Sequence, residues 1–437
     1  MQAVIMAGGK GTRLTSITKN EIPKPLVPVC GKPLLLWQID ELKKNGISDI
    51  VMIIGHLGHK IEEYFGDGQE FGIQISYIRE EIPLGTAGAF YYLKEFIREK
   101  YFLLVFGDVY FSIDIDRMEK FHLQKDSLAT LFVHPNSHPA DSDLVVLNAQ
   151  EKIVQFDSKN NVRDYWYDNC VNAGFYILDK SVCDYVSVPE KLDLEKDILM
   201  KMSESGKDIY GYRSPEYIKD CGTVERIMQT QKDILNGFIE QKCLKNKQKC
   251  IFLDRDGTIN QFKGLVWKED DFVLEERVFD AIKAINQSGW LGIVVTNQPS
   301  VARGLCDIQA IELIHKKMTT LLGQNGVYLD DILFCPHHPD KGYPEENPDY
   351  KIICSCRKPK TGMIDNVVEK YNIDIAKSWM IGDTTVDIQT GKNAGMKTAL
   401  VLTGEKGQDG KFPVKADIIC KNVYDAVQRV LNLEVDQ

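Results

Sequence analysis

The sequence predicts an α/β protein of two doubly wound domains, and two observations support this. Short apolar runs alternate with amphipathic stretches from residue 1 to about residue 237, which is typical of a mainly parallel sheet covered by helices. The alternation stops at a basic, polar run, CLKNKQK, and restarts at CIFLD. We therefore expect a first domain over residues 1–240, a linker over residues 241–249 and a second domain over residues 250–437.

The expected elements follow from the period of the apolar residues. Continuous apolar runs of strand length predict strands, and apolar residues three or four apart predict helices. The first half has strands at AVIMA, DIVMIIG and YFLLVFGD and helices at KPLLLWQIDELKKNG, GTAGAFYYLKEFI and VERIMQTQKDILNGFIEQ. The second half has strands at CIFLD, LGIVVTNQ, KSWMIGD and KTALVLTG, with helices at EERVFDAIKAINQSG and from about Asp307.

Composition narrows the class of protein. The 437 residues are 43% apolar and 27% charged, as in a globular protein, and no run of eighteen apolar residues or secretion signal is present. The net charge of −10 argues against a nucleic-acid surface. Eleven cysteines without a secretion signal favour metal ligation over disulfides. We expect a soluble, cytoplasmic protein that acts on small-molecule substrates and has no membrane or nucleic-acid partner. Both a monomer and a homo-oligomer are compatible with the sequence.

A glycine-rich loop, GGKGTRL, directly follows the first predicted strand. Glycines let backbone N–H groups approach an anion, so Gly8, Gly9, Gly11 and Thr12 are candidates for binding a nucleotide. The arginine of this loop adds a planar cation, and PKPL supplies a lysine held between prolines. The loop lacks the third glycine of the dinucleotide fingerprint and the terminal Gly-Lys-Ser/Thr of the Walker loop. A simple glycine turn is the alternative.

A second small-residue loop and two aspartates complete the candidate site of the first half. LGTAGA opens a predicted helix, and Gly85, Thr86 and Gly88 suit close packing against a flat base. Asp108 ends the strand YFLLVFGD, and Asp220 precedes the last helix of this half. Two carboxylates at strand ends are suited to Mg²⁺ beside a triphosphate, although a lone aspartate is more often a helix cap or turn residue.

The motifs GGKGTRL, PKPL, LGTAGA, FGD, NAGFYIL and KDCGT, in this order, resemble the sugar-phosphate nucleotidylyltransferases over nearly all of residues 1–235. The resemblance implies that a sugar 1-phosphate oxygen attacks the α-phosphorus of a nucleoside triphosphate and expels pyrophosphate. It assigns the pyrophosphate to Arg13, the α-phosphate to Lys24, and Mg²⁺ to the two aspartates. The implied sugar-phosphate and sugar contacts are Lys159, Asn172 and Gly174.

The stretch IFLDRDGTIN ends a predicted strand in two aspartates. Asp254 is placed to attack phosphorus, while Asp256 can protonate the leaving oxygen and later activate water. A turn with solvated acids is the alternative. Thr296, Lys358 and Asp383 would supply a hydroxyl, an ammonium and a carboxylate, with Asp254, Asp256 and Asp383 as the Mg²⁺ ligands. This ordered set resembles the haloacid dehalogenase-like phosphatases.

A second metal pattern lies between these motifs, in CPHHP and CSC. Cys335, His337, Cys354 and Cys356 would form a closed tetrahedral set, which predicts a structural Zn²⁺. On sequence alone either His337 or His338 is the ligand, and four unrelated buried side chains are the alternative.

DRDGTIN, TNQPSVARG, CPHHP, CSCRKP and GD together resemble the heptose 1,7-bisphosphate 7-phosphatases and the related histidinol-phosphate phosphatases over nearly all of residues 250–437. The resemblance implies that the metal-bound loop shapes the substrate entrance. It also implies substrate contacts from Asn297, Arg303 and Arg357.

The two resemblances together predict consecutive reactions. Removal of the 7-phosphate from a heptose 1,7-bisphosphate leaves a sugar 1-phosphate, the substrate class of the first half. We therefore expect a bifunctional enzyme that makes a nucleotide-activated heptose, with GDP-D-glycero-α-D-manno-heptose chosen by analogy with the guanylyltransferases. The alternatives are a mannose or glucose 1-phosphate nucleotidylyltransferase fused to a phosphatase of other specificity, and a chain in which one half is a non-catalytic sugar-nucleotide sensor.

Overall fold

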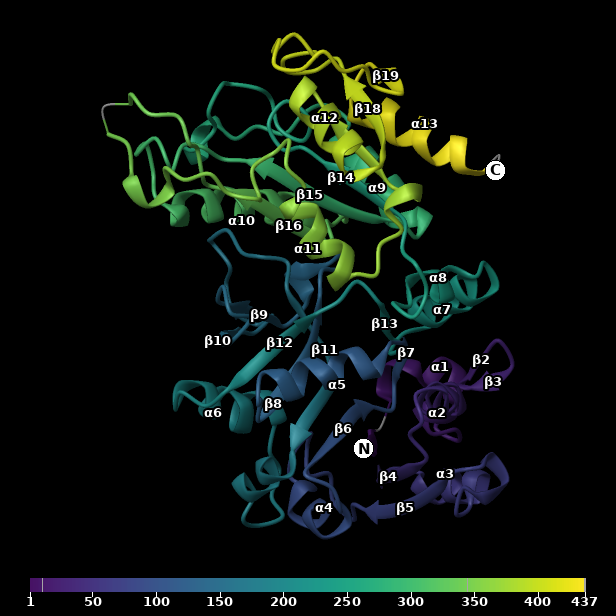
Figure 1. Cartoon of the computed structure of the whole chain (residues 1–437). Helices are drawn as coiled ribbons and strands as arrows, with labels where there is room; N and C mark the ends of the chain where they lie inside the picture. The colour runs from purple at the N-terminus through teal and green to yellow at the C-terminus, as the bar shows by residue number, and fades with distance from the viewer. Residues whose placement is uncertain (10, 344, 436–437) are drawn as a thin grey trace. The chain divides into compact units, whose positions relative to one another are not determined.

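The computed structural model describes residues 1–9, 11–343 and 345–435 (Figure 1). The chain divides into two units, both α/β as predicted. Unit 1 comprises Met1–His134, Asp143–Ser158 and Cys170–Cys243. Unit 2 comprises Leu244–Gln437 and two segments from earlier in the chain, Pro135–Ser142 and Lys159–Asn169.

Unit 1 is built on a mixed nine-stranded sheet with the order β10-β9-β11-β6-β1-β4-β5, in which β8 pairs with β11 and β12. Strand β1 lies between β4 and β6, parallel to both, which places its carboxyl end beside theirs. Two short pairs, β7 with β13 and β2 with β3, stand apart from this sheet. The strands are β1 (Gln2–Ala7), β2 (Pro28–Val29), β3 (Lys32–Pro33), β4 (Asp49–Ile54), β5 (Gln74–Arg79), β6 (Tyr101–Phe106), β7 (Val109–Ser112), β8 (Ala129–His134), β9 (Leu144–Leu147), β10 (Ile153–Asp157), β11 (Val171–Asp179), β12 (Ile209–Arg213) and β13 (Tyr217–Asp220).

Helices cover both faces of the main sheet of unit 1, because alternate strand residues point to opposite faces. Ile5 of β1 packs into a core with α2, α3 and α5, whereas Val4 packs into a core with α4, α6 and the π-helical segment Leu194–Leu199. The stretch predicted as one helix, VERIMQTQKDILNGFIEQ, forms two, because Gly237 between them adopts φ 68°. The helices are α1 (Thr15–Thr18), α2 (Leu34–Lys44), α3 (Gly58–Phe65), α4 (Phe90–Phe96), α5 (Ile115–Gln124), α6 (Met200–Glu204), α7 (Val224–Leu235) and α8 (Phe238–Lys242).

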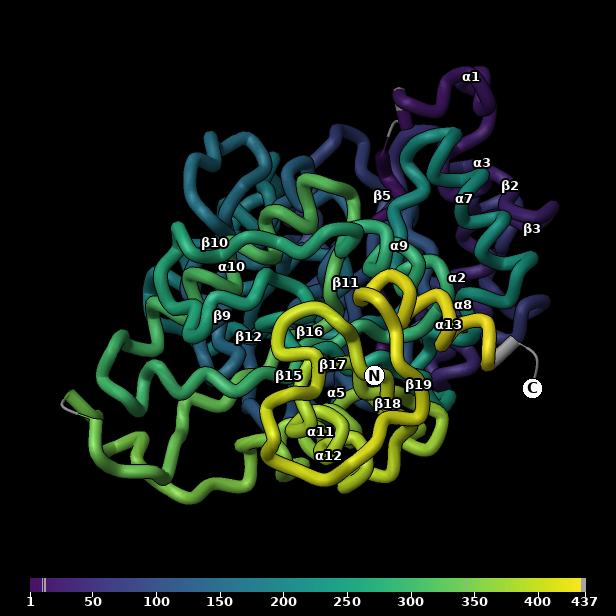
Figure 2. Tube along the Cα trace, turned by 90° about the horizontal axis from the view of Figure 1, so that it is seen from above, coloured from purple at the N-terminus to yellow at the C-terminus, as the bar shows by residue number. Residues whose placement is uncertain are grey.

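Unit 2 has a six-stranded parallel sheet with the order β16-β15-β14-β17-β18-β19. The order changes direction at β14, and ligands bind near such switch points, at the carboxyl ends of the strands. Helices α9, α10 and α13 lie on one side of the strands and α11 and α12 on the other (Figure 2). The elements are β14 (Cys250–Leu253), α9 (Val278–Ser288), β15 (Leu291–Asn297), α10 (Ile308–Gln324), β16 (Asp331–Cys335), α11 (Gly362–Lys370), β17 (Trp379–Gly382), α12 (Thr385–Ala394), β18 (Lys397–Val401), β19 (Ile418–Cys420) and α13 (Val423–Val435).

The segment predicted as a linker is packed from Leu244 onward. Leu244 and Gln248 are buried, and the backbone of Gln248 exchanges hydrogen bonds with Asn372 and Asp374. An apolar side chain in a polar run is enough to anchor the run to a core, which the composition of the segment did not indicate.

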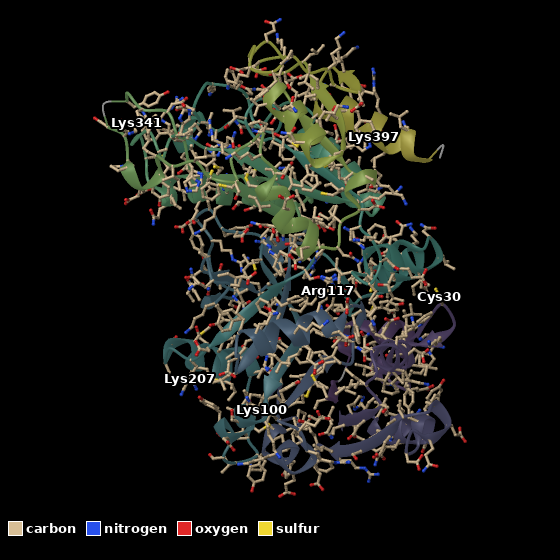
Figure 3. All side chains as sticks on the ribbon, viewed as in Figure 1. Cys30, Lys100, Arg117, Lys207, Lys341 and Lys397 are labelled. Atoms are coloured by element: carbon tan, nitrogen blue, oxygen red, sulfur yellow. The ribbon has the colours of Figure 1, made fainter. Side chains whose placement is uncertain are left out.

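The surface carries many charged side chains. Lys100, Lys207 and Lys341 are exposed, and the stick view labels them (Figure 3). Among the described residues, every helix is too short or too polar to span a lipid bilayer.

Candidate functional sites

The glycine-rich loop of unit 1 reaches the predicted lysine and aspartates. Gly11 has φ 62°, and a Cβ there would lie 3.0 Å from Cβ of Lys24. Lys24 forms an ion pair with Asp108, and its Nζ lies 3.9 Å from Oδ1 of Asp220. The structure therefore brings the loop, one ammonium and both predicted carboxylates together.

Asp220 ends β13 and pairs with Val109, the first residue of β7, directly after Asp108. Asp108 follows β6, and its carbonyl oxygen accepts a 2.7 Å hydrogen bond from the N–H of Cys221, next to Asp220. Arg226 of α7, which the sequence did not single out, forms an ion pair with Asp220, but Oδ1 of Asp220 has no hydrogen-bond partner in the described part of the chain. Arg13 lies close by: if Gly222 carried a Cβ atom, that atom would lie 2.9 Å from Nη2 of Arg13. Lys24 and Arg226 therefore pair with the two carboxylates, and Arg13 is a third cation nearby.

Glu80 connects the two glycine-containing loops and was not predicted. Its Oε2 lies 2.7 Å from where a Cβ of Gly8 would be, and its Oε1 accepts a 3.3 Å hydrogen bond from the N–H of Leu84. Burial raises the pKa of Glu80, and the Leu84 hydrogen bond opposes that rise. Gly9 has no described atom within 4 Å of its Cβ position, and the side chain of Thr12 lies outside the described residues.

The second loop packs tightly against a segment more than one hundred residues later. A Cβ on Gly85 would lie 2.2 Å from the carbonyl oxygen of Leu192, and one on Gly88 would lie 1.9 Å from that of Glu190. The N–H of Thr86 donates to Leu192 O at 2.9 Å, and its Oγ1 accepts from the N–H of Leu194 at 2.7 Å. These residues therefore anchor the start of the π-helical segment.

Asn172 and Gly174, predicted to contact the sugar, lie on β11 of unit 1, whereas Lys159 begins a segment assigned to unit 2. Nδ2 of Asn172 donates to Oε1 of Glu195 at 3.1 Å, and the hydroxyl of Tyr176 donates to the same oxygen at 2.5 Å. Glu195 is carried by the π-helical segment and was not predicted. Burial of Glu195 raises the pKa of its carboxyl to about 7, and the hydrogen bond from Tyr176 opposes this rise.

In unit 2, a buried ammonium joins two buried carboxylates. Nζ of Lys358 donates to Oδ1 of Asp254 at 2.8 Å and to Oδ1 of Asp387 at 2.5 Å. Burial alone would lower the pKa of Lys358, but the two carboxylates raise it above its ordinary value. Asp254 follows β14 as predicted, whereas Asp387 lies in the first turn of α12, where its carboxylate also caps the helix at Thr384. Because Asp387 does not follow a predicted strand, the sequence analysis did not single it out.

Asp383 completes this cluster at the end of β17. Oxygens of Asp254, Asp383 and Asp387 all lie within 4.8 Å of one another, so the three carboxylates could hold a metal ion. Burial and the neighbouring carboxylates raise the pKa of Asp254 to about 7 and that of Asp383 to about 9. Oδ1 of Asp383 has no hydrogen-bond partner among the described residues.

Two glycines admit the Asp383 carboxylate. A Cβ on Gly257 would lie 2.3 Å from Oδ2 of Asp383, and one on Gly404 would lie 2.0 Å from it. Both glycines also have positive φ, 77° and 56°. Any other residue at either position would displace the carboxylate.

The remaining predicted residues of unit 2 lie on the loops around this cluster. Nδ2 of Asn297 donates to the carbonyl oxygen of Lys358 at 3.1 Å, and Oδ1 of Asn297 accepts from the backbone N–H of Lys358 at 3.0 Å. Nη1 of Arg357 donates to the carbonyl oxygen of His337 at 3.0 Å, and the guanidinium of Arg303 lies over the ring of Tyr343 at 4.5 Å. Asn297 thus fixes the lysine loop, and Arg357 joins it to the Cys/His segment.

Cys335, His337, Cys354 and Cys356 converge and could hold a metal ion. The Sγ atoms are 3.2–3.6 Å apart, too long for a disulfide and near the edge of a tetrahedron with bonds of about 2.3 Å. Burial lowers the pKa of His337, a shift toward the neutral imidazole that metal ions bind. His338 instead accepts a hydrogen bond from the N–H of Asp340 at 3.2 Å. The geometry selects His337.

The two halves match different families. Residues 2–237 match the family described as nucleotidyl transferase, and residues 355–426 match the family described as HAD-hydrolase-like. A D-glycero-beta-D-manno-heptose-1,7-bisphosphate 7-phosphatase from Haemophilus ducreyi is 38% identical over 184 residues, which are 42% of this chain and 98% of that protein.

Two relatives match the first half. A D-glycero-alpha-D-manno-heptose 1-phosphate guanylyltransferase from Aneurinibacillus thermoaerophilus is 31% identical over 54% of this chain and 98% of that protein. A UTP–glucose-1-phosphate uridylyltransferase from Synechocystis sp. is 31% identical over 55% of this chain and 65% of that protein.

The close packing of Gly88 predicts that the second loop tolerates no side chain there. Gly88→Ala should lower the free energy of unfolding by about 1–3 kcal/mol, because its Cβ would overlap the Glu190 carbonyl oxygen. Gly9→Ala, in open space, should change it by less than about 1 kcal/mol. Chemical denaturation of both variants measures this, and equal stabilities would contradict the packing argument.

The raised pKa of Glu195 predicts a pH-dependent contribution to stability. A carboxyl that keeps its proton up to about pH 7 when folded stabilises the folded state below its unfolded pKa, and this contribution is lost as the pH rises through about 7. The loss should approach about 3 kcal/mol in the wild type and disappear in Glu195→Gln, which has no proton to lose.

Unfolding midpoints of the two proteins between pH 5 and 8 test this prediction. Glu190→Gln, at an exposed side chain in the same region, is the matched control and should behave as the wild type. Parallel pH profiles for the wild type and Glu195→Gln would show that Glu195 is ionised throughout.

Proposed function

The chain belongs to the nucleotidyl transferases in its first half and to the haloacid dehalogenase-like phosphatases in its second, and we propose that these halves catalyse consecutive reactions. Unit 2 removes the 7-phosphate of D-glycero-D-manno-heptose 1,7-bisphosphate. Unit 1 then transfers a nucleotidyl group, GMP from GTP, to the resulting heptose 1-phosphate. The observation that carries the proposal is that each half spans 98% of a relative named for one of these two steps.

In the proposed phosphatase reaction, an Asp254 oxygen attacks phosphorus and the bond from phosphorus to the sugar oxygen breaks. Asp256 gives a proton to that leaving oxygen. Water then attacks the phosphoaspartate, giving its proton to Asp256 as the bond to Asp254 breaks and inorganic phosphate leaves. Lys358, whose ammonium contacts Asp254, neutralises charge on the phosphoryl oxygens.

In the proposed transfer reaction, an oxygen of the sugar 1-phosphate attacks the α-phosphorus, and the bond to the β-phosphate oxygen breaks to release pyrophosphate. This displacement needs positioning and charge neutralisation rather than a covalent intermediate. Lys24 and Arg13 supply cations beside the glycine loop, and Asn172 holds the sugar from β11. The amide of Asn172 is in turn held by Glu195.

The proposed metals match the donor sets. The set predicted from sequence was Asp254, Asp256 and Asp383, but the carboxylates that converge are those of Asp254, Asp383 and Asp387. These three fit Mg²⁺, because the donors are all oxygen and one buried oxygen of Asp383 lacks a partner among the described residues. Asp108 and Asp220 form the corresponding pair in unit 1. Mg²⁺ there would neutralise phosphate charge. Three thiolates and one imidazole fit a structural Zn²⁺ with no open position.

The nucleotide and the anomer rest on the relatives' names. The guanylyltransferase favours GTP and an α-anomer, whereas the uridylyltransferase of equal identity is named for UTP and glucose, and the phosphatase is named for a β-anomer. A hexose 1-phosphate uridylyltransferase is therefore the second candidate for unit 1. Phosphorylated sugars and a nucleoside triphosphate as substrates fit a cytoplasmic location.

Separate substitutions should divide the two activities. Asp254→Asn should abolish phosphate release from the bisphosphate, because it removes the nucleophile, yet leave nucleotidyl transfer to pre-made heptose 1-phosphate intact. Asp108→Asn should do the reverse, with transfer reduced by at least about 100-fold. Incubation of each variant with both anomers, Mg²⁺ and each nucleoside triphosphate, followed by mass spectrometry, measures phosphate, pyrophosphate and nucleotide sugar.

A GDP-heptose formed by the wild type from one anomer would support the full proposal. Formation of UDP-glucose from glucose 1-phosphate, with no heptose product, would favour the second candidate. Phosphate release without transfer to any sugar 1-phosphate would mean that unit 1 is a binding module.

The Cys/His cluster predicts one tightly held zinc ion per chain. Cys354→Ser should lose this ion and expose the described residues next to the cluster to proteolysis, because the thiolates no longer hold them. Cys306→Ser, at a partly exposed cysteine of the same unit outside the cluster, is the matched control. Metal analysis and limited proteolysis measure both effects, and an unchanged zinc content in Cys354→Ser would contradict the site.

A further inference from the structure

Asp256 is held by a dense set of hydrogen bonds that the reaction described above does not use. Arg255 is fully buried, and the two N–H groups of its Nη2 are shared among both Asp256 oxygens at 2.9 and 3.0 Å, Oε1 of Gln298 at 2.9 Å and the carbonyl oxygen of Val266 at 2.8 Å. Nδ2 of Asn260 donates to Oδ1 at 3.0 Å, and Nε2 of Gln298 donates to Oδ2 at 2.8 Å. Hydrogen bonds from neighbouring side chains thus fix the orientation of both carboxylate oxygens of Asp256.

Gln298 also reaches a second predicted residue. It follows β15, its side chain is buried, and its Nε2 lies 2.9 Å from Oγ1 of Thr296. A primary amide has two N–H donors, so one can serve Asp256 and the other Thr296. One buried amide therefore bridges the carboxylate and the hydroxyl of the candidate phosphatase site.

The orientation of this amide is set from the opposite side. Oε1 of Gln298 accepts a 2.9 Å hydrogen bond from Nη2 of Arg255. If the amide were rotated by half a turn, its oxygen would face the Asp256 carboxylate and its N–H groups would face the guanidinium. Both contacts would be repulsive, so Arg255 fixes which end of the amide points into the site.

This orientation fixes the direction of the Thr296 hydroxyl proton. Because Nε2 of Gln298 has no acceptor capacity, Oγ1 of Thr296 must accept from it, and the hydroxyl hydrogen is left free to be donated elsewhere. The acceptor that the proposed reaction offers is a phosphoryl oxygen.

We propose that Gln298, oriented by Arg255, is a positioning residue that aims the Thr296 hydroxyl at the phosphoryl group and the Asp256 carboxylate at the leaving oxygen. The proposal rests on the phosphatase function proposed for unit 2. It extends that function, because one buried amide would then position both the group that binds the phosphoryl oxygens and the group that transfers the proton.

The test uses two phosphomonoesters that differ in their need for an acid. The alkoxide of a heptose 7-phosphate ester must be protonated to leave, whereas the phenolate of p-nitrophenyl phosphate leaves without a proton. Gln298→Met removes both N–H donors at similar volume. It should lower first-turnover release of the sugar by about 10- to 100-fold, as for other supporting hydrogen bonds, and lower release of p-nitrophenolate clearly less.

Two further variants make the result specific. Gln298→Glu replaces the donor by an acceptor, so the Thr296 hydroxyl would turn toward it, and both a raised KM and a larger fall in kcat are expected. Gln248→Met removes another buried glutamine of unit 2, outside this network, and should change stability without changing either rate. If Gln298→Met does not fold, Gln298→Asn, which withdraws the amide but keeps its polarity, replaces it.

Equal losses with both esters, or losses matched by Gln248→Met, would overturn the proposal and leave Gln298 as a packing residue. A wild-type protein that hydrolyses neither ester would instead overturn the phosphatase function itself. A clearly larger loss with the sugar ester than with p-nitrophenyl phosphate, with unchanged thermal stability, is the expected result.

Discussion

A lysine ammonium held between two aspartates is the interaction on which both candidate sites depend. Lys358 lies between Asp254 and Asp387, and Lys24 contacts Asp108 with Asp220 close by. Carboxylates gathered in a poorly solvated place repel one another unless a cation or proton compensates them. In unit 2 one ammonium does not suffice: burial, and after it repulsion from the neighbouring carboxylates, raises the pKa of Asp254 and of Asp383.

This electrostatic strain also explains why the clusters suit phosphate chemistry. A divalent cation would bind where the carboxylates already converge, and the lysine would face the phosphoryl oxygens that arrive with it. Glycines make the convergence sterically possible. Gly257 and Gly404 leave room for Asp383, and Gly11 leaves room for the Lys24 stem. Glycines that leave space for the charged groups are therefore as necessary to these sites as the charged groups themselves.

Each site is supported by the hydrophobic clusters of its own unit. The two faces of the main sheet of unit 1 form separate cores, and so do the two faces of the sheet of unit 2. In unit 2, parallel strands deliver their last residues to one edge of the sheet, which is why Asp254 and Asp383 meet. In unit 1, Asp220 reaches Asp108 through the antiparallel pairing of β13 with β7. A chain that carries two such edges can carry two reactions, and the product class of one proposed reaction is the substrate class of the other.

The sequence by itself determined the fold class, the strand-end residues Asp108, Asp254 and Asp383, and the Cys/His set, because apolar period and short motifs are local signals. Only the tertiary structure decided that His337 rather than His338 joins the cysteines. It alone revealed the partners that packing brings from distant segments, since such contacts leave no local pattern. Those partners are Glu80, Glu195, Arg226, Arg255, Gln298 and Asp387.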